Sequence, residues 1–337
     1  MNYQAYAASE PGARLEAISL PLPDQLRPFE VDIQVEYCGI CHSDVHLIDN
    51  DWGISAYPLV PGHEVVGTVV RCGPEVRHLK VGQRVGVGWQ SGSCLHCEWC
   101  ASGWENLCAQ EEATCVGRPG GFAERLMVDS RFAFPLPESL SPEVAAPLLC
   151  AGITVYSPLV TWQVTAGDRV AVVGVGGLGH LAIQFARALG CEVAAISHSP
   201  EKAREVKQLG AHHFIQLDNR EQFKSYRRYF DFILSTVYHP LDWKQFLLLL
   251  RPRGKLCFVG APGEPLNFSP AHLLEGHLVV CASTIGSRHQ IMQMLRFAAL
   301  HDITAKTEVV PVSRINAAID KVRQGAARYR MVLKMNP

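Results

Sequence analysis

Apolar and polar positions follow two different rhythms along the chain, and the change comes near residue 169. Before that point, short runs rich in β-branched residues alternate with Gly and Pro, and long helical periodicity is nearly absent. Four of these runs predict strands, at residues 31–37, 65–71, 84–87 and 123–128. The first 150 residues are therefore expected to be mostly β.

From residue 169 onward, strand-like apolar runs alternate with stretches of helical period. Predicted strands lie at residues 169–173, 192–196, 213–217, 232–235, 255–259 and 278–282. Predicted helices lie between them at 178–189, 200–209 and 243–250, and the tail adds helices near 290–300 and 315–323 and a strand near 329–335. This βαβ alternation is typical of a parallel, doubly wound sheet.

Bulk composition narrows the class of protein. The 337 residues, 48% of them hydrophobic, can bury a large core, and the length predicts about two domains. The 31 Lys and Arg nearly cancel the 32 Asp and Glu, and no basic stripe is present, which excludes nucleic acid as an expected partner. The start has no basic segment followed by an apolar one, and no run of 18 uninterrupted apolar residues occurs. We expect a cytoplasmic protein without a membrane partner.

Four of the twelve cysteines fall close together, at Cys94, Cys97, Cys100 and Cys108. Four thiolates on one short loop can close a tetrahedral shell around zinc with no position left for water, which describes a structural site. Disulfides and a coincidence of free thiols are the alternatives, and an iron–sulfur cluster is the chemical rival. Zinc is favoured because the spacing matches none of the usual ferredoxin patterns. Six of the other cysteines lie scattered through apolar segments and are expected to pack as small buried side chains.

A glycine motif follows the first strand of the α/β region, with Gly174, Gly176 and Gly179 in the Gly-x-Gly-x-x-Gly pattern and Gly177 and Leu178 between them. Glycines permit the tight turn and the close approach of the backbone to a dinucleotide, whose pyrophosphate rests on the N-terminus of the following helix. An apolar strand before the motif and a helical stretch after it make this signal informative. The sequence therefore predicts a dinucleotide-binding domain.

The end of the second strand bears on which dinucleotide is bound. An NAD-specific domain usually offers an acid there, but this chain has Ser197, followed by His198 and Ser199. Hydroxyl groups together with the Lys202 cation could hold a 2′-phosphate, which favours NADP(H) over NAD(H). Glu201 opposes this preference because its carboxylate would repel the phosphate, and Lys202 could instead be an ordinary exposed helix residue.

Two thiolates, one imidazole and a water make a zinc site with one exchangeable position. Cys41, His63 and Cys150 could supply such a set, but spacing does not join them, because Cys150 lies far from Cys41 in sequence. Taken singly, each is more typical of a buried thiol or a core histidine.

Several segments together resemble the zinc-containing medium-chain alcohol dehydrogenases, and most closely the cinnamyl alcohol dehydrogenase-like branch. They are residues 41–46, 57–67 and 148–157 and the four-cysteine segment, and the likeness is most specific up to about residue 180. The resemblance implies an α/β protein with a doubly wound parallel Rossmann sheet and a mostly β, GroES-like catalytic domain. The catalytic domain, with both zinc sites, is expected at 1–151 and 286–337, and the NADP(H)-binding domain at 152–285.

The resemblance also assigns roles around a catalytic zinc. It makes Cys41, His63 and Cys150 the ligands and places the Glu64 carboxylate near the metal. Asp44 becomes the acid that orients the histidine ligand, although a cap at a helix start is an almost equal alternative for it.

Proton transfer and cofactor contacts follow from the same resemblance. Ser43 would contact the substrate oxygen and pass its proton through the cofactor ribose to His46, which could otherwise be a polar surface histidine. His42 would meet the pyrophosphate. The residues expected near the nicotinamide are Thr154, Val259, Ser283 and Ile285.

Trp52 and Trp89 resemble substrate-pocket positions that would favour apolar or aromatic aldehydes, although either could be ordinary core packing. The function expected is hydride transfer between NADP(H) and a primary alcohol or aldehyde, with two zinc ions per chain. A zinc polyol or secondary-alcohol dehydrogenase and a catalytically silent scaffold that binds NADPH and zinc are the alternatives, and a zinc-free quinone reductase is disfavoured. A homodimer is expected, with the strand at 278–282 pairing across a two-fold axis.

Overall fold

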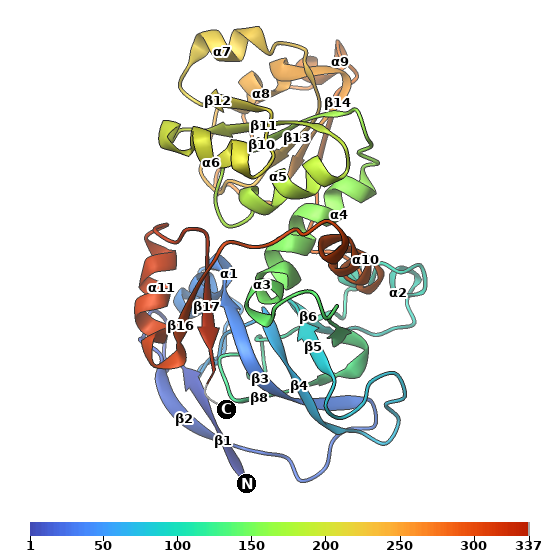
Figure 1. The fold of residues 1–337 in the computed structure, drawn as a ribbon, viewed down its shortest axis with the longest axis vertical. Helices are drawn as coiled ribbons and strands as arrows, with labels where there is room; N and C mark the ends of the chain where they lie inside the picture. The colour runs from blue at the N-terminus through green and yellow to red at the C-terminus, as the bar shows by residue number, and fades with distance from the viewer. Residues whose placement is uncertain (336–337) are drawn as a thin grey trace. The chain divides into compact units, whose positions relative to one another are not determined.

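The computed structural model of the chain describes residues 1–335 and divides into two compact units. Residues 1–153 and 286–335 form the first unit, and Thr154–Ile285 form the second (Figure 1). Residues 336 and 337, which the sequence assigns to the catalytic domain, lie outside the described residues.

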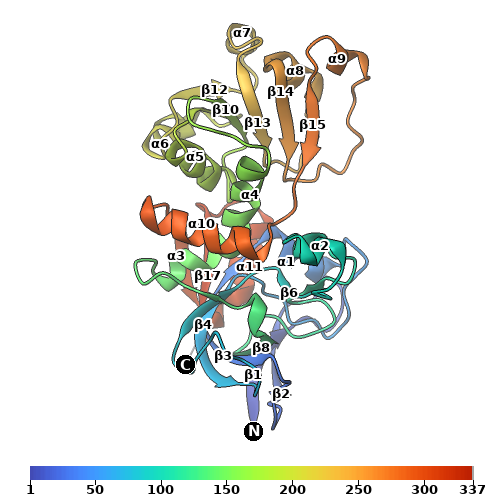
Figure 2. The ribbon, with the colours of Figure 1, turned by 90° about the vertical axis from the view of Figure 1, so that its right-hand side faces the viewer.

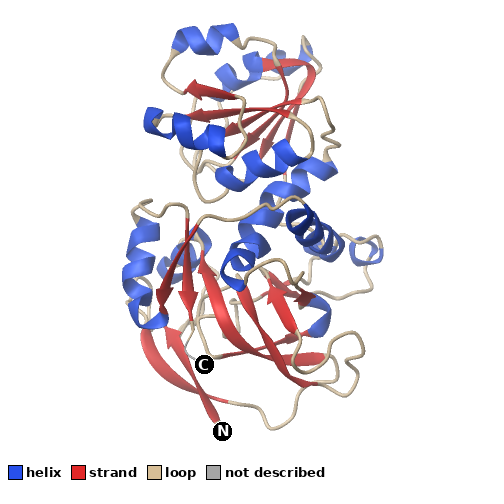
Figure 3. Cartoon of the chain, viewed as in Figure 1, coloured by secondary structure: helices blue, strands red, loops and turns tan. Residues whose placement is uncertain are grey.

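The first unit is built on a mixed, largely antiparallel sheet, in which β16, β17, β3, β4, β5 and β9 lie in that order and β8 also pairs with β3. Short β1 and β2 pair with each other beside it, as Figure 3 shows in red. The strands are β1 (Asn2–Ala7), β2 (Glu16–Pro21), β3 (Glu30–Ile40), β4 (Val65–Cys72), β5 (Arg84–Val87), β8 (Arg125–Asp129), β9 (Phe134–Pro135), β16 (Thr307–Pro311) and β17 (Arg330–Lys334).

Three helices of the first unit each bury an apolar face. Helix α11 (Ile315–Arg323) buries Ile315, Ala318, Ile319 and Val322, which recur at the three- and four-residue spacing of a helix face. Helix α10 (Arg288–Leu300) begins at a capping box in which Ser287 and Gln290 exchange hydrogen bonds with each other's backbone. Helix α1 (His42–Asp49) follows β3 directly.

A continuous helical stretch connects the two units. It consists of α3 (Pro142–Pro147), the π-helical segment η3 (Leu148–Gly152) and α4 (Ile153–Thr161). Among residues 1–335, this stretch is the one helix long and apolar enough to cross a membrane, but 78% of its most apolar window is buried inside the protein. Its apolar character is that of a core helix.

The second unit is a six-stranded sheet in which every neighbouring pair is parallel. In chain order its strands are β10 (Arg169–Val173), β11 (Glu192–Ser197), β12 (His213–Gln216), β13 (Phe230–Ser235), β14 (Leu250–Phe258) and β15 (Val279–Ala282). Their order across the sheet, β12-β11-β10-β13-β14-β15, is the 3-2-1-4-5-6 order of dinucleotide-binding domains. The prediction of a doubly wound parallel sheet is confirmed.

Helices lie on both sides of this sheet (Figure 2). They are α5 (Gly179–Ala188), α6 (Ala203–Gln208), α7 (Arg220–Ser225), α8 (Trp243–Leu249) and α9 (Ala271–Leu274). Phe223 of α7 and Trp243 and Phe246 of α8 pack with Ile233 and Leu256 of the strands into one apolar core. The point where the strand order reverses lies between β10 and β13, and ligands of such sheets bind outside the carboxyl ends of the strands at this point.

Candidate metal and cofactor sites

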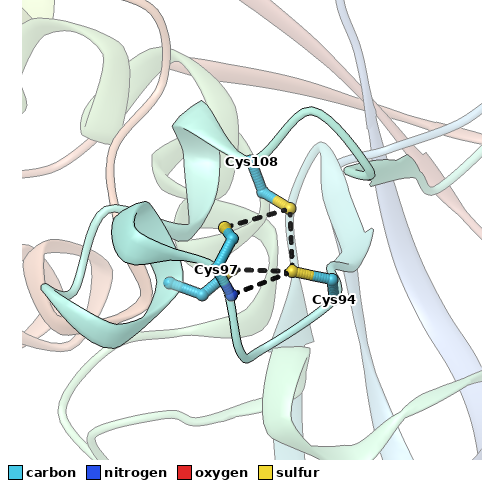
Figure 4. Close-up of side chains that lie close together, drawn as sticks. Cys94, Cys97 and Cys108 are labelled. Carbon is cyan, nitrogen blue, oxygen red and sulfur yellow. Dashed lines mark hydrogen bonds between the residues drawn. The ribbon is translucent and has the colours of Figure 1, made fainter.

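The four clustered cysteines converge on one point, as Figure 4 shows for Cys94, Cys97 and Cys108. Cys94 follows the short strand β6 (Gln90–Gly92), Cys97 and Cys100 lie at the start and inside of α2 (Glu98–Ala101), and Cys108 ends the turn η1 (Glu105–Leu107). All four sulfur atoms lie within 4.8 Å of one another. The sequence spacing and the local turns therefore gather four donors without help from distant segments.

The geometry of these sulfur atoms fits a tetrahedral zinc ion. Sulfur–sulfur distances are 3.5 Å for Cys94–Cys108 and 3.9 Å for both Cys94–Cys100 and Cys97–Cys108. Four sulfur atoms at a Zn–S distance of ~2.3 Å stand ~3.8 Å apart, which matches. Backbone N–H groups at His96 and Cys97 lower the pKa of Cys94 to about 6. The Cys94 thiol therefore loses its proton readily, and the thiolate is the form that binds a metal.

A second set of donors comes from three distant segments of the first unit. Cys41 ends the connection from β3 to α1, His63 and Glu64 precede β4, and Cys150 lies in the π-helical segment η3. Donor atoms of all four lie within 4.8 Å of one another, and every one of these side chains is buried. π-helical turns are rare, but those that occur are often found at functional sites. The turn in η3 carries Cys150, a candidate ligand.

The free atoms of this cluster are those that a metal would use. The sulfur atoms of Cys41 and Cys150 lie 3.9 Å apart, the separation expected for two ligands of one tetrahedral zinc. His63 Nε2 is buried without a hydrogen-bond partner, while its Nδ1 is bonded to Asp44. A buried nitrogen without a partner is costly unless something binds it, so the donors fit a zinc ion.

Asp44 is completely buried and holds three groups at once. Its Oδ1 accepts hydrogen bonds from His63 Nδ1 and the Gly62 N–H, both at 3.0 Å, and its Oδ2 accepts from the Cys41 N–H at 2.8 Å. The last bond caps helix α1, and the first orients the imidazole. Asp44 therefore both caps helix α1 and orients His63, the two roles considered for it from the sequence.

Glu64 has a partner that the sequence analysis did not identify. Arg330, at the start of β17, forms a hydrogen-bonded ion pair with Glu64 Oε1, and both side chains are almost completely buried. Burial raises the pKa of Glu64 to about 7, against the attraction of Arg330. Because 266 residues separate the two, only the antiparallel pairing of β17 with β3 reveals the contact.

Aromatic side chains border the histidine of this cluster. The Trp89 ring lies edge-on to the His63 ring with 5.1 Å between centroids, and Trp52 lies 6.1 Å from Trp89. Trp52 is 45% exposed, and Trp89 lines a cavity of about 660 Å³. Trp52 therefore lies outside the core, whereas Trp89 packs against the core of the first unit and also lines the cavity. The rings of His46 and Trp52 are tilted to each other with centroids 5.2 Å apart, and His46 Nδ1 is bonded to Asp51 at 2.6 Å.

Ser43 and Cys115 also reach this cluster. The Ser43 hydroxyl oxygen lies 3.6 Å from the sulfur of Cys41. Cys115 is buried, and its sulfur lies with His63 and Asp44 in a third group of close donor atoms. Cys115 is one of the scattered cysteines, and no sequence motif marks it as part of a site. His42, for which the pyrophosphate was expected, is half-buried, with its ring 5.8 Å from that of His46.

The glycine motif forms the turn between β10 and α5. Gly174 has a φ of +89°, a conformation that L side chains rarely adopt, and a Cβ on Gly179 would lie 1.9 Å from the Gly174 carbonyl oxygen. Gly176, in contrast, faces open space, since nothing lies within 4 Å of the position of its Cβ. Gly177 and Leu178 complete the turn, and α5 begins at Gly179, one residue later than predicted. Gly174 and Gly179 thus allow the tight turn, and Gly176 leaves the outer face of the turn open.

Polar residues after β11 lie beside this turn. Lys202 Nζ donates to the Val175 carbonyl oxygen at 2.6 Å, which ties it to the glycine motif. Ser197, the last residue of β11, accepts a hydrogen bond from the Ser199 N–H, and both serines are buried, whereas His198 is exposed. The alternative of a purely exposed helix residue is wrong for Lys202.

The residues expected at the nicotinamide lie at the carboxyl ends of β14 and β15 and at the start of α4. Val259 directly follows β14, and its N–H donates to the Ser235 carbonyl oxygen. The Ser283 hydroxyl lies 3.2 Å from that of Ser157, and Ile285 is buried with a φ of +36°. Thr154 is half-buried in the first turn of α4.

Comparison with known proteins decides the family. Residues 27–138 match the alcohol dehydrogenase GroES-like domain and residues 177–299 match the zinc-binding dehydrogenase domain. An aldehyde reductase AdhA of Synechocystis is 47% identical over 98% of both chains. The chain belongs to the zinc-containing medium-chain alcohol dehydrogenases. It is an oxidoreductase of the alcohol dehydrogenase class, and the expected resemblance and enzyme class are confirmed.

Other relatives of this dehydrogenase extend the comparison. A probable mannitol dehydrogenase of Fragaria ananassa is 43% identical over 90% of this chain and 87% of its own. Among solved structures, a cinnamyl alcohol dehydrogenase of Sorghum bicolor superposes with a TM-score of 0.94 at 39% identity, covering 99% of this chain and 98% of its own. A cinnamyl alcohol dehydrogenase from Helicobacter pylori, solved with NADP(H), has a TM-score of 0.91 at 31% identity and covers 99% of both chains. These likenesses confirm the combination of a GroES-like and a Rossmann domain.

Proposed function

We propose that this dehydrogenase is an NADP(H)-dependent aldehyde reductase with two zinc ions per chain, one structural and one catalytic. The observation that carries the proposal is the buried donor set of the first unit. It combines two thiols 3.9 Å apart with a histidine nitrogen that has no other partner. Three protein ligands leave one position of a tetrahedral zinc for substrate, as in catalytic zinc sites. The four-cysteine cluster leaves none.

Bound zinc would supply a Lewis acid that stabilises negative charge on the substrate oxygen, and the nicotinamide would exchange the hydride. The residues of the chain hold and orient these groups. Asp44 fixes the tautomer of His63 so that Nε2 stays free for the metal. The nearby hydroxyl of Ser43 can exchange a proton with the substrate oxygen, and His46 can pass it to water. The pair Glu64–Arg330 keeps a carboxylate within reach of the ligands.

Two features support NADP(H) over NAD(H). No acid stands at the end of β11, where Ser197 offers a hydroxyl, and Lys202 is held against the glycine motif. The Glu201 carboxylate opposes this preference, because it would repel a 2′-phosphate. A relative of known structure carries NADP(H), which agrees with this preference.

The aromatic wall favours apolar or aromatic primary aldehydes and alcohols. Trp89 stands edge-on to His63, so a substrate whose oxygen approaches the metal site would meet an apolar ring rather than hydrogen-bonding groups. The relatives named mannitol dehydrogenase make a polyol the second candidate. A panel of benzaldehyde, cinnamaldehyde and mannitol separates the two, since a polyol enzyme would turn over mannitol best.

The deciding experiment measures zinc content by mass spectrometry and NADPH consumption with benzaldehyde. The wild type should hold two zinc ions per chain, and Cys150→Ser should hold one and lose turnover while its melting temperature changes little. Cys97→Ser should also fall to one zinc but lose thermal stability first, because a closed site pins a loop. Cys191→Ser is the matched control: a buried thiol of the second unit, outside both clusters, whose hydroxyl can replace the bond to Thr165. An active wild type with one zinc or none would contradict the proposal.

Cofactor preference has its own test. Ser197→Asp places a carboxylate where it would accept from the ribose 2′-hydroxyl and repel a 2′-phosphate, so the ratio of kcat/KM for NADPH over NADH should fall at least ~10-fold, the cost of one strong hydrogen bond. Ser225→Asp on the exposed end of α7 adds the same charge elsewhere on the second unit and should leave the ratio unchanged. Equal ratios in all three proteins would mean that the end of β11 does not select the cofactor.

A further inference from the structure

Two cysteines that the function does not use lie opposite each other on neighbouring strands of the second unit. Cys257 of β14 and Cys281 of β15 are paired in register, and both are free thiols. Neighbouring strands lie ~4.8 Å apart, and disulfides bridge Cα atoms separated by ~4.4–6.8 Å. Directly paired residues also point to the same face of a sheet. The pair therefore has the backbone spacing of a cross-strand disulfide.

The two thiols differ in their surroundings. Cys257 is completely buried, whereas Cys281 is half-buried on β15, an edge strand of the six-stranded sheet. A hydrogen bond from Cys257 lowers the pKa of Cys281, with burial opposing and Lys255 assisting, while the same contact raises the pKa of Cys257. Such an arrangement gives one reachable, more acidic thiol and one buried thiol beside it.

We propose that Cys257 and Cys281 are a redox modification site, which a hydroperoxide such as hydrogen peroxide converts to a reversible disulfide. The Cys281 thiolate attacks the peroxide, the O–O bond breaks, and Cys281 becomes a sulfenic acid as water is released after proton uptake. The Cys257 sulfur then attacks the Cys281 sulfur, forming the S–S bond and releasing a second water. Two thiols lose two electrons, and one peroxide is reduced to two waters. A dithiol reductant reverses the change.

The bridge would act on the ends of both strands. Val259 and Ser283 each lie two residues after a cysteine of the pair, so the strand alternation places each on the same face as the cysteine before it. A disulfide needs Cβ atoms ~3.5–4.5 Å apart, closer than the ordinary strand spacing, so closing it draws β14 and β15 together. This consequence rests on the proposed function, in which Val259 and Ser283 contact the nicotinamide. Oxidation should weaken NADPH binding several-fold.

A second copy of the chain could add a strand to the sheet at β15. The backbone pairing of that strand would leave the Cys281 thiol accessible. Strand addition uses the N–H and C=O groups in the plane of the sheet, whereas the Cys281 side chain stands on its face.

The sequence makes the bridge easy to map. No Lys or Arg lies between Lys255 and Arg288, so trypsin releases both cysteines in one peptide, 256–288, which holds no other cysteine. The zinc-loaded enzyme is treated with hydrogen peroxide, its remaining thiols are alkylated, and the peptide is weighed. A bridged peptide carries no alkyl group and lacks two hydrogens. Cleavage after Glu275 then leaves the two cysteine fragments joined only through the disulfide.

The expected result is a bridge in the native enzyme that dithiothreitol removes and that is absent from Cys281→Ser and Cys257→Ala. The proposal is overturned if both cysteines remain alkylated when other thiols are oxidised. It is also overturned if Cys281 is oxidised further without bridging, or if the bridge forms equally fast in urea, where the strand register is lost.

A second readout tests the consequence. NADPH affinity is measured by fluorescence for the wild type and for Cys281→Ser, each before and after peroxide, with zinc content checked in every sample. A loss of affinity confined to the oxidised wild type and restored by dithiothreitol supports the coupling, and an unchanged affinity in a fully bridged sample contradicts it. If NADPH binds neither form, the proposed function fails, while the mapping still decides whether the site exists.

Discussion

At the scale of single residues, the candidate catalytic site depends on side chains that each serve two neighbours. Asp44 caps α1 and orients His63, and Glu64 lies close to the sulfur atoms of Cys41 and Cys150 while it pairs with Arg330. Burying an acid is costly unless its charge is compensated. Asp44 has a hydrogen-bond donor for each oxygen, whereas Glu64 has Arg330 for Oε1 and no partner for Oε2. Their substitution should therefore affect metal binding and folding to different degrees.

Asp44→Asn keeps one oxygen for Gly62 and His63 but loses the charge and cannot accept from the Cys41 N–H. We expect zinc affinity to fall ~10- to 100-fold, as is usual when the partner of a histidine ligand is lost. Stability should fall by about 1–3 kcal/mol because the Cys41 donor is left buried and unpaired. Competition with a chelator measures the first effect and urea denaturation the second.

Asp32→Asn is the control for this experiment. Asp32 is a completely buried acid of the same unit, paired with Arg71 and Arg125 and away from both clusters. Its substitution should lower stability and leave zinc competition unchanged. If Asp44→Asn behaves in the same way, Asp44 serves the fold alone.

Sequence reasoning reached these residues unevenly. The four-cysteine segment was predictable because all its donors lie on one loop, where spacing reports geometry directly. The set Cys41, His63 and Cys150 needed the family resemblance, and Arg330 was missed altogether. A buried partner contributed by a distant strand leaves no local pattern in the sequence.

At the scale of elements, prediction succeeded for short, almost wholly buried apolar strands and for a helix with one buried face, and it failed where tertiary contacts decide. Strands β5 and β10 and helix α11 begin and end where the periodicity predicts. The pair β1–β2, strand β16 and the helical stretch from Pro142 were not predicted. The last contains two prolines after its first residue and a π-helical turn, features that argue against a helix unless packing imposes it.

The turn between β10 and α5 yields a prediction that separates folding from binding. Gly179→Ala should destabilise the second unit, because the new Cβ would collide with the Gly174 carbonyl oxygen. Gly176→Ala meets nothing within 4 Å and should leave the melting temperature unchanged, but it should raise the Kd for NADPH by blocking the approach of the pyrophosphate. Thermal denaturation and fluorescence titration of the two variants decide the matter. Normal NADPH binding by Gly176→Ala would show that this glycine does not face the cofactor.

At the scale of the whole molecule, the strand order of the second unit could be anticipated from the βαβ rhythm, because parallel strands need crossover helices and those crossovers have one hand. The first unit could not be ordered in this way. Its sheet combines segments from both ends of the chain, with β17 beside β3 and β16 beside β17. Such a strand order depends on pairing between segments that are distant in sequence, and local periodicity carries no information about that pairing.

Assembly is a prediction at this scale. β15 is an edge strand, and pairing of its free edge with a second copy would give a homodimer with a sheet continued across a two-fold axis. Sedimentation equilibrium at micromolar concentration should give twice the 37.1 kDa of the chain. A mass of one chain over the whole concentration range would contradict the dimer.

The four-cysteine segment has a consequence for how such enzymes diversify. All its donors lie between Cys94 and Cys108, so one deletion or one exchange of a short stretch removes or transfers the complete site. The donors proposed for the catalytic zinc come from three separate segments, and no single event of that kind can move them together. If the two sites have the proposed roles, a lineage can gain or lose the four-cysteine site in one step while its chemistry is inherited unchanged.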